Sequence, residues 1–336
     1  MDYLKDRVTI YEVAKASGVS LATVSRVINK RGNVTDATRK KVEATIERLG
    51  YKPSGLARAL ATSVTTNIGV VIPSANYVYI SNMLHGITEV AKEKGFILTL
   101  FVTSYSREDA ISVVEKVITS HVDGAIIFDD QLDKEDVETI NSYSVPTIVI
   151  NNKIVGQRVG CINFNHEHAL NELLKERKQK NIHHKPPVFL HVHNAGRLLS
   201  RIEKTFIKFH NDIDMSYRIF NVDDSSKRTY FDFLEFFKKN RNGFFVAYRD
   251  SIAAAIVNAA KDSGLEVPKD VEVVSIIGTK YARILRPNLS SFYINMQEVG
   301  KRAMYMLIDL LKGELIEKSY KFDATYTARE STIEKE

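Results

Sequence analysis

The residues SLATVSRVINK, from Ser20 to Lys30, mix aliphatic side chains with hydroxyl, amide and guanidinium groups at helical spacing. Ser20 is a good N-cap for a helix from Leu21 to about Asn29. Three aliphatic residues of this helix fall on one side and should pack inward: Val24, Val27 and Ile28. The other side carries Leu21, Ala22, Ser25, Arg26 and Asn29. Because arginine reads guanine O6 and N7 and apolar groups read the thymine methyl, this second side fits a major groove.

Two further helices are expected around this one. Thr9 and Glu12 have the spacing of a capping box, so a helix should begin at Ile10 and stop near Gly18. A third helix should run from Asp36 to Leu49, capped by Thr35 and ended by Gly50. A helix, a short glycine-containing turn and a second helix predict a helix-turn-helix.

The excess positive charge supports this interpretation. Residues 1–62 hold 12 of the 47 Lys and Arg residues but only 6 of the 41 Asp and Glu residues. The rest of the chain therefore has 35 of each and is neutral. A basic segment on a neutral body is typical of a nucleic-acid-binding head, although a merely solvated basic surface has the same composition.

Composition narrows the class of protein. No apolar run is long enough to span a membrane, the first residues lack a secretion signal, and Cys161 is the one cysteine. We therefore expect a soluble cytoplasmic protein without disulfides. Dinucleotide, Walker A, zinc-protease and nucleophile-elbow motifs are absent, so neither an enzyme nor a cofactor is expected. A periplasmic-type ligand-binding protein is also disfavoured, because it would lack the basic head.

The segment YKPSGLARALATS follows the head at residues 51–63. Its LARAL portion is apolar and helix-prone, but a helix this short is marginal in water unless it packs on a partner. We interpret residues 1–50 as the head and 51–65 as a hinge helix or linker. A plain flexible linker is the alternative.

The remaining residues alternate between apolar, β-rich runs and amphipathic helices. Nearly continuous apolar strands flanked by such helices predict a parallel sheet covered on both faces. The expected strands are 67–73, 97–103, 124–130, 146–152, 160–165, 187–193, 217–222, 243–248 and 271–278. The expected helices are 81–94, 107–119, 134–142, 167–178, 198–210, 227–239, 251–263 and 296–311.

Several of these stretches resemble the LacI–GalR family of bacterial transcription regulators. The motifs are VTIYEVAKASGVSLATVSRVINK, VTDATRKKV, IERLGYKPSGLARAL, IGVVIP, DSGLEVPKDVEVVSIIG, RPNLSS and ARESTI. The head and hinge are most similar to the catabolite control protein A branch. The resemblance implies a periplasmic-binding-protein-like body of two Rossmann-like subdomains with three chain crossings, and a helix at 296–311 that returns to the first subdomain. We expect the subdomains at 66–163 with 293–322, and at 164–292 with 323–336.

For the head, the resemblance implies a role for each matching residue. The positions that contact base edges are Leu21, Ala22 and Arg26. The positions that contact phosphates or support docking are Thr9, Tyr11, Ser20, Thr23, Ser25, Asn29, Thr35 and Thr38. In the hinge, Leu60 matches a minor-groove wedge, with Ala57 and Arg58 beside it. Because two hinge helices meet on the DNA, the family pattern implies a homodimer, expected to be a repressor, on a pseudo-palindromic operator. No leucine-heptad tail follows ARESTI, so a tetramer of that kind is not expected.

Effector contacts in such a body should lie beyond the carboxyl ends of the strands. Topology places there Ser74–Tyr77, Ser104, Asp129–Asp130, Asn151, Asn165, His193–Asn194, Arg249–Asp250 and Ile277–Gly278. Our candidate effector-binding residues are Ser74, Tyr77, Ser104, Asp129, Asn165, His193, Arg201, Arg249 and Asp250. For any one of them, an ordinary polar loop residue is the alternative.

The body departs from the sugar-binding pattern of the family at three places. Ile202 stands at the usual arginine offset before Phe206, and Ile277 and Phe164 stand where acids are usual. A pocket without those groups does not hold sugar hydroxyls in the usual way. The effector is therefore unusual, for example an anion held by Arg201 and Arg249, or absent. In the second case a protein partner, such as the phosphocarrier that the family uses, would regulate the body. The histidines near 166–193 match no zinc signature, and we expect surface histidines rather than a metal site.

Overall fold

The computed structural model describes residues 8–29, 32, 34–52, 65–73, 77–103, 107–182, 185–193, 195–314 and 317–333. The chain divides into two compact units, Met1–Thr66 and Asn67–Glu336, which we call the head and the body. Across these described ranges, no helix combines the length and apolar character needed to cross a membrane.

The head is a three-helix unit around a small core. Its helices are α1 (Ile10–Ser17), α2 (Leu21–Ile28) and α3 (Asp36–Leu49). One buried cluster joins them, made of Val13, Val24, Val27, Val42 and Tyr51. The predicted helix-turn-helix is confirmed, and so is the inward side of α2, apart from Ile28, which is half-buried against this core.

The helix ends are fixed by the residues that the sequence suggested. Thr9 and Glu12 form a capping box, in which the Thr9 backbone N–H donates to the Glu12 carboxylate at 2.7 Å. Gly18 and Gly50 end α1 and α3 with φ of 62° and 63°, in the left-handed region that glycine adopts without a Cβ penalty. The turn before α2 is therefore set by local chemistry.

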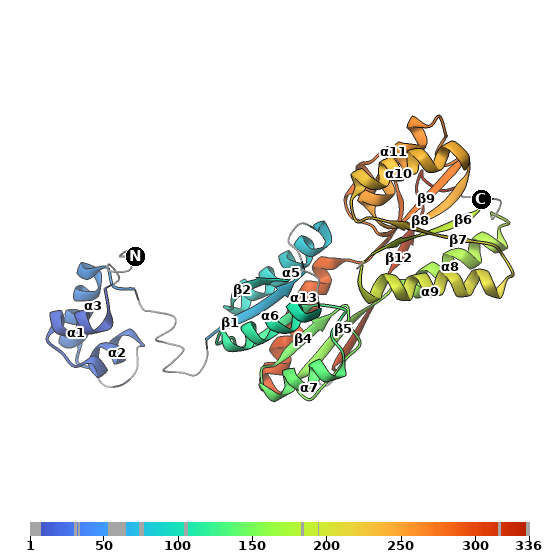
Figure 1. Cartoon of the computed structure of the whole chain (residues 1–336). Helices are drawn as coiled ribbons and strands as arrows, with labels where there is room; N and C mark the ends of the chain where they lie inside the picture. The colour runs from blue at the N-terminus through green and yellow to red at the C-terminus, as the bar shows by residue number, and fades with distance from the viewer. Residues whose placement is uncertain are drawn as a thin grey trace. The chain divides into compact units, whose positions relative to one another are not determined.

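The body begins with a sheet of six parallel strands in the order β11-β5-β4-β3-β1-β2 (Figure 1). The strands are β1 (Asn67–Ile72), β2 (Ile97–Val102), β3 (Gly124–Phe128), β4 (Thr147–Ile150), β5 (Val159–Asn165) and β11 (Ser319–Asp323). Alternate residues of β1 pack into two different hydrophobic clusters. Val70 and Ile72 pack on one face of the sheet, and Val71 packs on the other. This is the period-two pattern of a strand buried on both faces.

Two helix pairs cover this first sheet. One face packs against α5 (Val78–Lys94) and α13 (Met296–Lys312), and the other against α6 (Arg107–Thr119) and α7 (Lys134–Ser142). Gly86 of α5 and Gly300 of α13 allow a close helix crossing. A Cβ on Gly86 would lie 2.0 Å from the Gln297 carbonyl oxygen, and a Cβ on Gly300 would lie 2.1 Å from that of Met83. Helix α13 thus returns to the first subdomain, as expected.

A second six-stranded sheet follows in the order β12-β10-β9-β8-β6-β7, with only β12 antiparallel. Its strands are β6 (Pro187–Val192), β7 (Arg218–Val222), β8 (Gly243–Arg249), β9 (Val271–Ile277), β10 (Ser290–Tyr293) and β12 (Thr325–Thr327). Helices α8 (His166–Gln179) and α9 (Gly196–Asp212) lie on one face, and α10 (Ser226–Lys239) and α11 (Asp250–Asp262) on the other (Figure 1). The short α12 (Tyr281–Ile284) follows β9.

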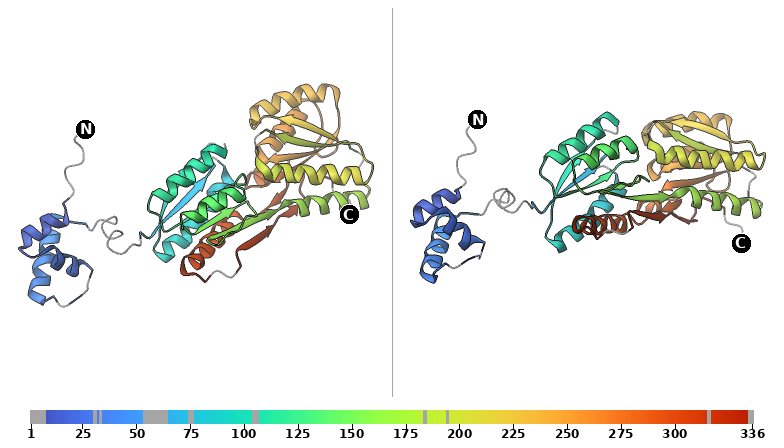
Figure 2. Two further views of the ribbon diagram at one scale, coloured as in Figure 1. Left: turned by 60° about the horizontal axis from the view of Figure 1, so that its bottom comes forward. Right: turned by 90° about the horizontal axis from the view of Figure 1, so that it is seen from below.

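Three segments connect the two sheets: β5 to α8, β10 to α13, and β11 to β12 (Figure 2). The predicted fold class, a helical head and a body of two Rossmann-like subdomains, is confirmed. The subdomain divisions expected at 163/164, 292/293 and 322/323 each fall inside a strand, within two residues of its end. Strands β10, β11 and β12 and helix α12 were not predicted.

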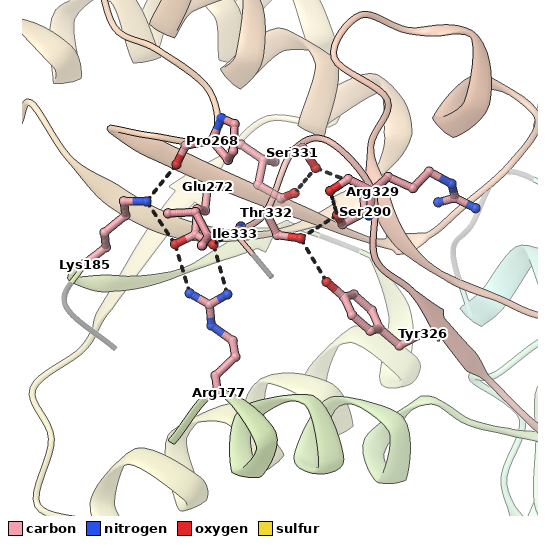
Figure 3. A network of polar contacts seen from close by, with 11 residues as sticks. Arg177, Lys185, Pro268, Glu272, Ser290, Tyr326, Arg329, Ser331, Thr332 and Ile333 are labelled. Atoms are coloured by element: carbon pink, nitrogen blue, oxygen red, sulfur yellow. Dashed lines mark hydrogen bonds and ion pairs between the residues drawn. The ribbon is translucent and has the colours of Figure 1, made fainter. Parts of the chain in front are cut away.

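A buried polar network ties the C-terminal segment to the second sheet (Figure 3). Both Nη atoms of Arg177 donate to the Glu272 carboxylate at 3.0 Å, and Lys185 Nζ donates to the same group at 3.0 Å. The backbone N–H of Ile333 also donates to Glu272, at 2.8 Å, and Ser331 Oγ donates to the Val273 carbonyl at 2.6 Å. One carboxylate therefore joins α8, β9 and the end of the described chain.

Candidate functional sites

Helix α2 presents a polar surface opposite its core side. Leu21, Ala22 and Arg26 are exposed, while Val24 and Val27 are buried. The N-cap is Ser20, whose Oγ accepts the Thr23 N–H at 3.2 Å. The three residues expected to contact base edges are therefore free to meet a groove, on a helix whose start is fixed.

Three hydroxyl residues expected at phosphates are also the helix caps. Thr9, Ser20 and Thr35 begin α1, α2 and α3. Ser20 and Thr35 each share a 2.9 Å hydrogen bond with the hydroxyl three residues on, that of Thr23 or Thr38. A helix N-terminus attracts phosphate through its dipole and its free N–H groups. These positions therefore suit phosphate contacts in addition to capping.

The last turn of α2 holds two more of the expected phosphate positions. The Asn29 amide donates to the Ser25 carbonyl oxygen at 2.9 Å and to the Ser25 hydroxyl at 3.3 Å. This pairing was not foreseen, and it orients both side chains. Tyr11 of α1 is 70% exposed, which is unusual for so large a ring and leaves its hydroxyl available. The hinge positions Ala57, Arg58 and Leu60 lie outside the described residues, as do Ser74 and Ser104.

The body has a cavity where the strands of the first sheet end. β3, β4 and β5 are neighbours, and the residues that follow or end them lie together: Asp129, Asp130, Asn151, Phe164 and His166 all line it. Ala195, Gly196 and Tyr248 line it from the second subdomain. The cavity thus lies at the carboxyl edge expected for ligands, between the two subdomains of the body.

Of the seven described candidate effector-binding residues, only Asp129 lines this cavity, although Asp130, Asn151, Ile277 and Gly278 from the wider topological set line it too. The other six have different surroundings. Asn165 donates to Asp323 at 2.5 Å, and Asp250 accepts from the Thr279 N–H and hydroxyl at 2.6 and 2.8 Å. His193 lines a separate surface pocket, and Tyr77 donates to Asp224 at 3.2 Å across the two subdomains. Asn165 thus joins two neighbouring strands, and Tyr77 joins the two subdomains.

The two arginines proposed for an anionic ligand already have acidic partners. Arg201 Nε donates to Glu167 at 2.7 Å, and Arg249 forms an ion pair with Asp224. The Arg249 guanidinium also lies 4.5 Å from the centre of the Tyr77 ring. Neither arginine lines the cavity. An anion site built on Arg201 and Arg249 stays a prediction: acids distant in sequence pair with both, while Arg201 Nη2 and Arg249 Nε are buried with no hydrogen-bond partner among the described residues.

His166 is the site residue that the sequence interpretation missed. It is buried at the start of α8, whereas surface histidines were expected here. Burial lowers the pKa of His166 to about 4, so the ring is neutral at pH 7. Its position directly after Asn165, at the end of a predicted strand, was the signal that could have found it. Within the described ranges, no group of three or more His, Cys, Asp or Glu side chains has the arrangement of a metal site.

Asp130 connects the subdomains beside the cavity. It follows β3, and its carboxylate accepts the Leu198 N–H at 2.8 Å in the first turn of α9. Gly196 gives it room, since a Cβ there would lie 2.6 Å from both carboxylate oxygens. Arg197 Nη1 also donates across the junction, to the Leu132 carbonyl at 3.3 Å. The protein's own carboxylate thus accepts from the first turn of α9.

Known proteins match both units. Residues 9–54 match the family described as bacterial regulatory proteins, lacI family, and residues 210–332 match the periplasmic binding protein-like domain. Catabolite control protein A of Priestia megaterium is 28% identical over 321 residues, 93% of this chain and 95% of that protein. The HTH-type transcriptional regulator pepR1 of Lactobacillus delbrueckii subsp. lactis is 30% identical over 326 residues, 94% and 95% of the two chains.

Solved structures agree on the fold. The lac repressor dimer bound to operator and the anti-inducer ONPF superposes with a TM-score of 0.82 at 23% identity, covering 98% of this chain and 100% of that one. A LacI-family transcriptional regulator from Silicibacter pomeroyi superposes with a TM-score of 0.84 at 20% identity, and the match covers 96% of this chain and 99% of that one. The relatives are transcription regulators, which confirms the predicted class of regulator rather than enzyme. The chain belongs to the LacI family of bacterial regulatory proteins.

Proposed function

We propose that this protein is a dimeric repressor that binds a pseudo-palindromic operator and is modulated through its body. The observation that carries the proposal is the capped helix α2, with Leu21, Ala22 and Arg26 exposed on a basic head. Selection of genomic DNA fragments by the purified protein tests it. Recovery of a shared palindromic sequence is expected, and recovery of unrelated fragments would contradict the proposal. Repeating the selection with a metabolite pool and with a seryl-phosphorylated phosphocarrier protein tests the modulation.

Within this proposal, α2 reads bases and the caps hold phosphates. Arg26 would read a guanine, and Leu21 and Ala22 would contact thymine methyl groups. The phosphate contacts would come from Thr9, Tyr11, Ser20, Thr23, Ser25, Asn29, Thr35 and Thr38. Phosphate contacts set the register of the head on the duplex without carrying sequence information.

Replacing Arg26 by alanine should relax specificity at one base pair of each half-site, at a cost of about 1–3 kcal/mol for the preferred base. The measurement is binding to a set of operators with single base-pair changes. Arg48→Ala is the matched control, because Arg48 is an exposed arginine on α3 rather than α2. Uniform weakening across all operators by Arg26→Ala would mean that Arg26 contacts phosphate only.

Replacing Leu60 by alanine should reduce the bending of bound DNA more than it changes half-site preference. In the proposal, Leu60 enters the minor groove with Ala57 and Arg58 beside it. Unstacking a base step costs about a few kcal/mol, and the larger contact area between the protein and the bent DNA offsets this cost. Bending is measured by energy transfer between dyes at the operator ends. Unchanged bending with Leu60→Ala would remove the wedge from the proposal.

The surface of the first sheet supports a homodimer. β2 is an edge strand, and three of its aliphatic residues are largely exposed: Ile97 (62%), Leu100 (48%) and Val102 (54%). An exposed apolar edge strand promotes aggregation unless another chain or element covers it. The proposed dimer would cover this strand.

An effector-independent body, or one regulated only by a protein partner, is the second candidate. The observation that favours it is the contact of Asp130 with the first turn of α9, which joins the subdomains without a ligand. If metabolites do not change operator binding, this second candidate is preferred, and the effect of the phosphocarrier protein then distinguishes a partner-regulated body from an independent one.

A further inference from the structure

The cavity between the subdomains of the body has an unusual balance of polar groups. Two carboxylates line it, Asp129 and Asp130, and the described residues that line it include no lysine or arginine. Oδ1 of Asp129 accepts the Gln131 and Leu132 N–H groups at 2.5 and 3.0 Å. Its Oδ2 makes no hydrogen bond with the described part of the chain. The cavity is therefore acidic, and Oδ2 of the half-buried Asp129 is open to water or to a ligand.

Two buried polar atoms in the same lining lack partners. Asn151 is 6% exposed and His166 is 5% exposed, and both line the cavity. Asn151 Oδ1 and His166 Nδ1 have no hydrogen-bond partner among the described residues. An unpaired buried polar atom is costly, so a native structure normally supplies a partner. Asn151 Oδ1 can only accept a hydrogen bond, which means that the missing partner carries N–H or O–H groups.

Aromatic rings form the rest of the wall. Tyr79, Phe128, Phe164, Tyr248 and Phe292 line the cavity. The Phe128 ring centre lies 6.1 Å from that of Tyr79 and 6.3 Å from that of Phe164. Aromatic faces attract cations, and a ring of them around a carboxylate is a favourable setting for an organic ammonium group.

We propose that this cavity binds a small protonated amine or guanidine that carries N–H groups. The N–H groups would donate to Asp129 Oδ2, Asn151 Oδ1 and His166 Nδ1, and the aromatic wall would hold the cationic carbon skeleton. The inference rests on the proposed function, since it names the chemical class of effector for the body of the regulator. The effector is opposite in charge to the anion that Arg201 and Arg249 had suggested.

The chemistry of the cavity argues against other ligand classes. Its volume is about 60 Å³, more than the roughly 10–15 Å³ that a single water needs, so it has room for a small molecule. Phe164 and Ile277 in the wall offer the hydroxyls of a hexose nothing to bond. An anion would face two carboxylates, and the positive groups that act on Asp130, Arg197 and Arg201, lie outside the described lining, which is unfavourable for an anion in a buried site. Ordered water alone is the remaining occupant.

A ligand here would act on both subdomains. The acceptors Asp129 and Asn151 follow strands of the first sheet, whereas Gly196 and Tyr248 line the same cavity from the second subdomain. A ligand bound between them would favour the arrangement in which both walls are close. It changes operator affinity only as far as it binds the two arrangements differently.

The test uses the full chain and calorimetry at constant ionic strength, with 1,4-diaminobutane, guanidinium, tetramethylammonium, glycerol and acetate as probes. Saturable binding of diaminobutane or guanidinium, at least tenfold tighter than that of the other three, is expected. Asp129→Asn keeps the side-chain shape and the Oδ1 acceptor, and it should weaken amine binding at least tenfold. Asp212→Asn is the matched control, because Asp212 is an exposed aspartate at the end of α9, and binding should not change.

Three outcomes would overturn the inference. The first is no saturable binding of either N–H cation, which would leave ordered water in the cavity. The second is equal binding of tetramethylammonium, glycerol or acetate, and the third is unchanged amine binding with Asp129→Asn. Operator binding by the same samples separates this inference from the proposed function. If the wild-type protein binds its operator specifically but binds no amine, only the amine proposal is contradicted. If the wild-type protein does not bind an operator, the proposed repressor function is contradicted.

Discussion

Raising the salt concentration from about 50 to about 200 mM should weaken operator binding by about 10³-fold. Each phosphate neutralised by Lys or Arg releases counterions, with a slope of about −0.9 in log K against log salt. If a dimer neutralises about six phosphates, the slope is about −5. Residues 1–62 carry the whole net charge of +6, so the head is the source of this dependence. Fluorescence anisotropy of a labelled operator over a salt series measures the slope.

A lysine of the body supplies the control for this salt series. Lys312 is an exposed residue at the end of α13, and the body outside the head has equal numbers of acids and bases. Lys312→Gln should leave the slope unchanged. A flat salt dependence of the wild-type protein would contradict a phosphate-contacting head. A slope that changes with Lys312→Gln would place part of the electrostatic contact on the body.

Local patterns in the sequence predicted most of the fold. Runs such as NIGVVIP and GAIIF are strands because both faces of the sheet are covered, which favours continuous apolar residues. β11 lacks this signal, since its residues alternate between exposed and half-buried and include Lys321. It becomes a strand by pairing with β5, more than 150 residues earlier, and no local pattern records such a pairing.

The site was only partly predictable, for the same reason. Topology correctly placed Asp129, Asp130 and Asn151 at the carboxyl edge of the first sheet, because the end of a parallel strand is visible in the sequence. It did not show that Glu167 pairs with Arg201, or Asp224 with Arg249. Those contacts join separate elements and remove both arginines from the cavity. The chemistry of the cavity therefore depends on side-chain partners that only the folded chain brings together.

Replacing Arg177 by methionine should destabilise the body by about 3–5 kcal/mol, because it leaves the buried Glu272 carboxylate without its main partner. Glu272 has a side chain only 2% exposed, and the Arg177 guanidinium lies 3.9 Å from the centre of the Phe244 ring. Methionine keeps much of the apolar contact with that ring, so the loss reports mainly on the charge. Urea unfolding of the full chain, followed by near-ultraviolet circular dichroism, gives the free energy of unfolding.

The pH dependence of this stability has a defined sign. Burial alone would raise the pKa of Glu272, but Arg177, the Ile333 N–H and Lys185 outweigh it and hold the pKa below its ordinary value. The carboxylate therefore stabilises the folded state above its unfolded pKa, and this contribution is lost as the pH falls through the lower folded pKa. In the Arg177→Met variant, the free energy of unfolding should therefore fall less steeply as the pH is lowered on the acid side.

An exposed ion pair gives the contrast that identifies burial as the cause. Glu266 and Lys269 are 3.1 Å apart, and their side chains are 69% and 70% exposed. Glu266→Gln should change the free energy of unfolding by less than about 1 kcal/mol, because solvent screens the pair. Adding both Glu272→Leu and Lys185→Met to Arg177→Met should recover part of the lost stability, since it removes the buried carboxylate together with the lysine that pairs with it. If the triple variant is no more stable than Arg177→Met, the loss comes from packing and the polar network contributes little.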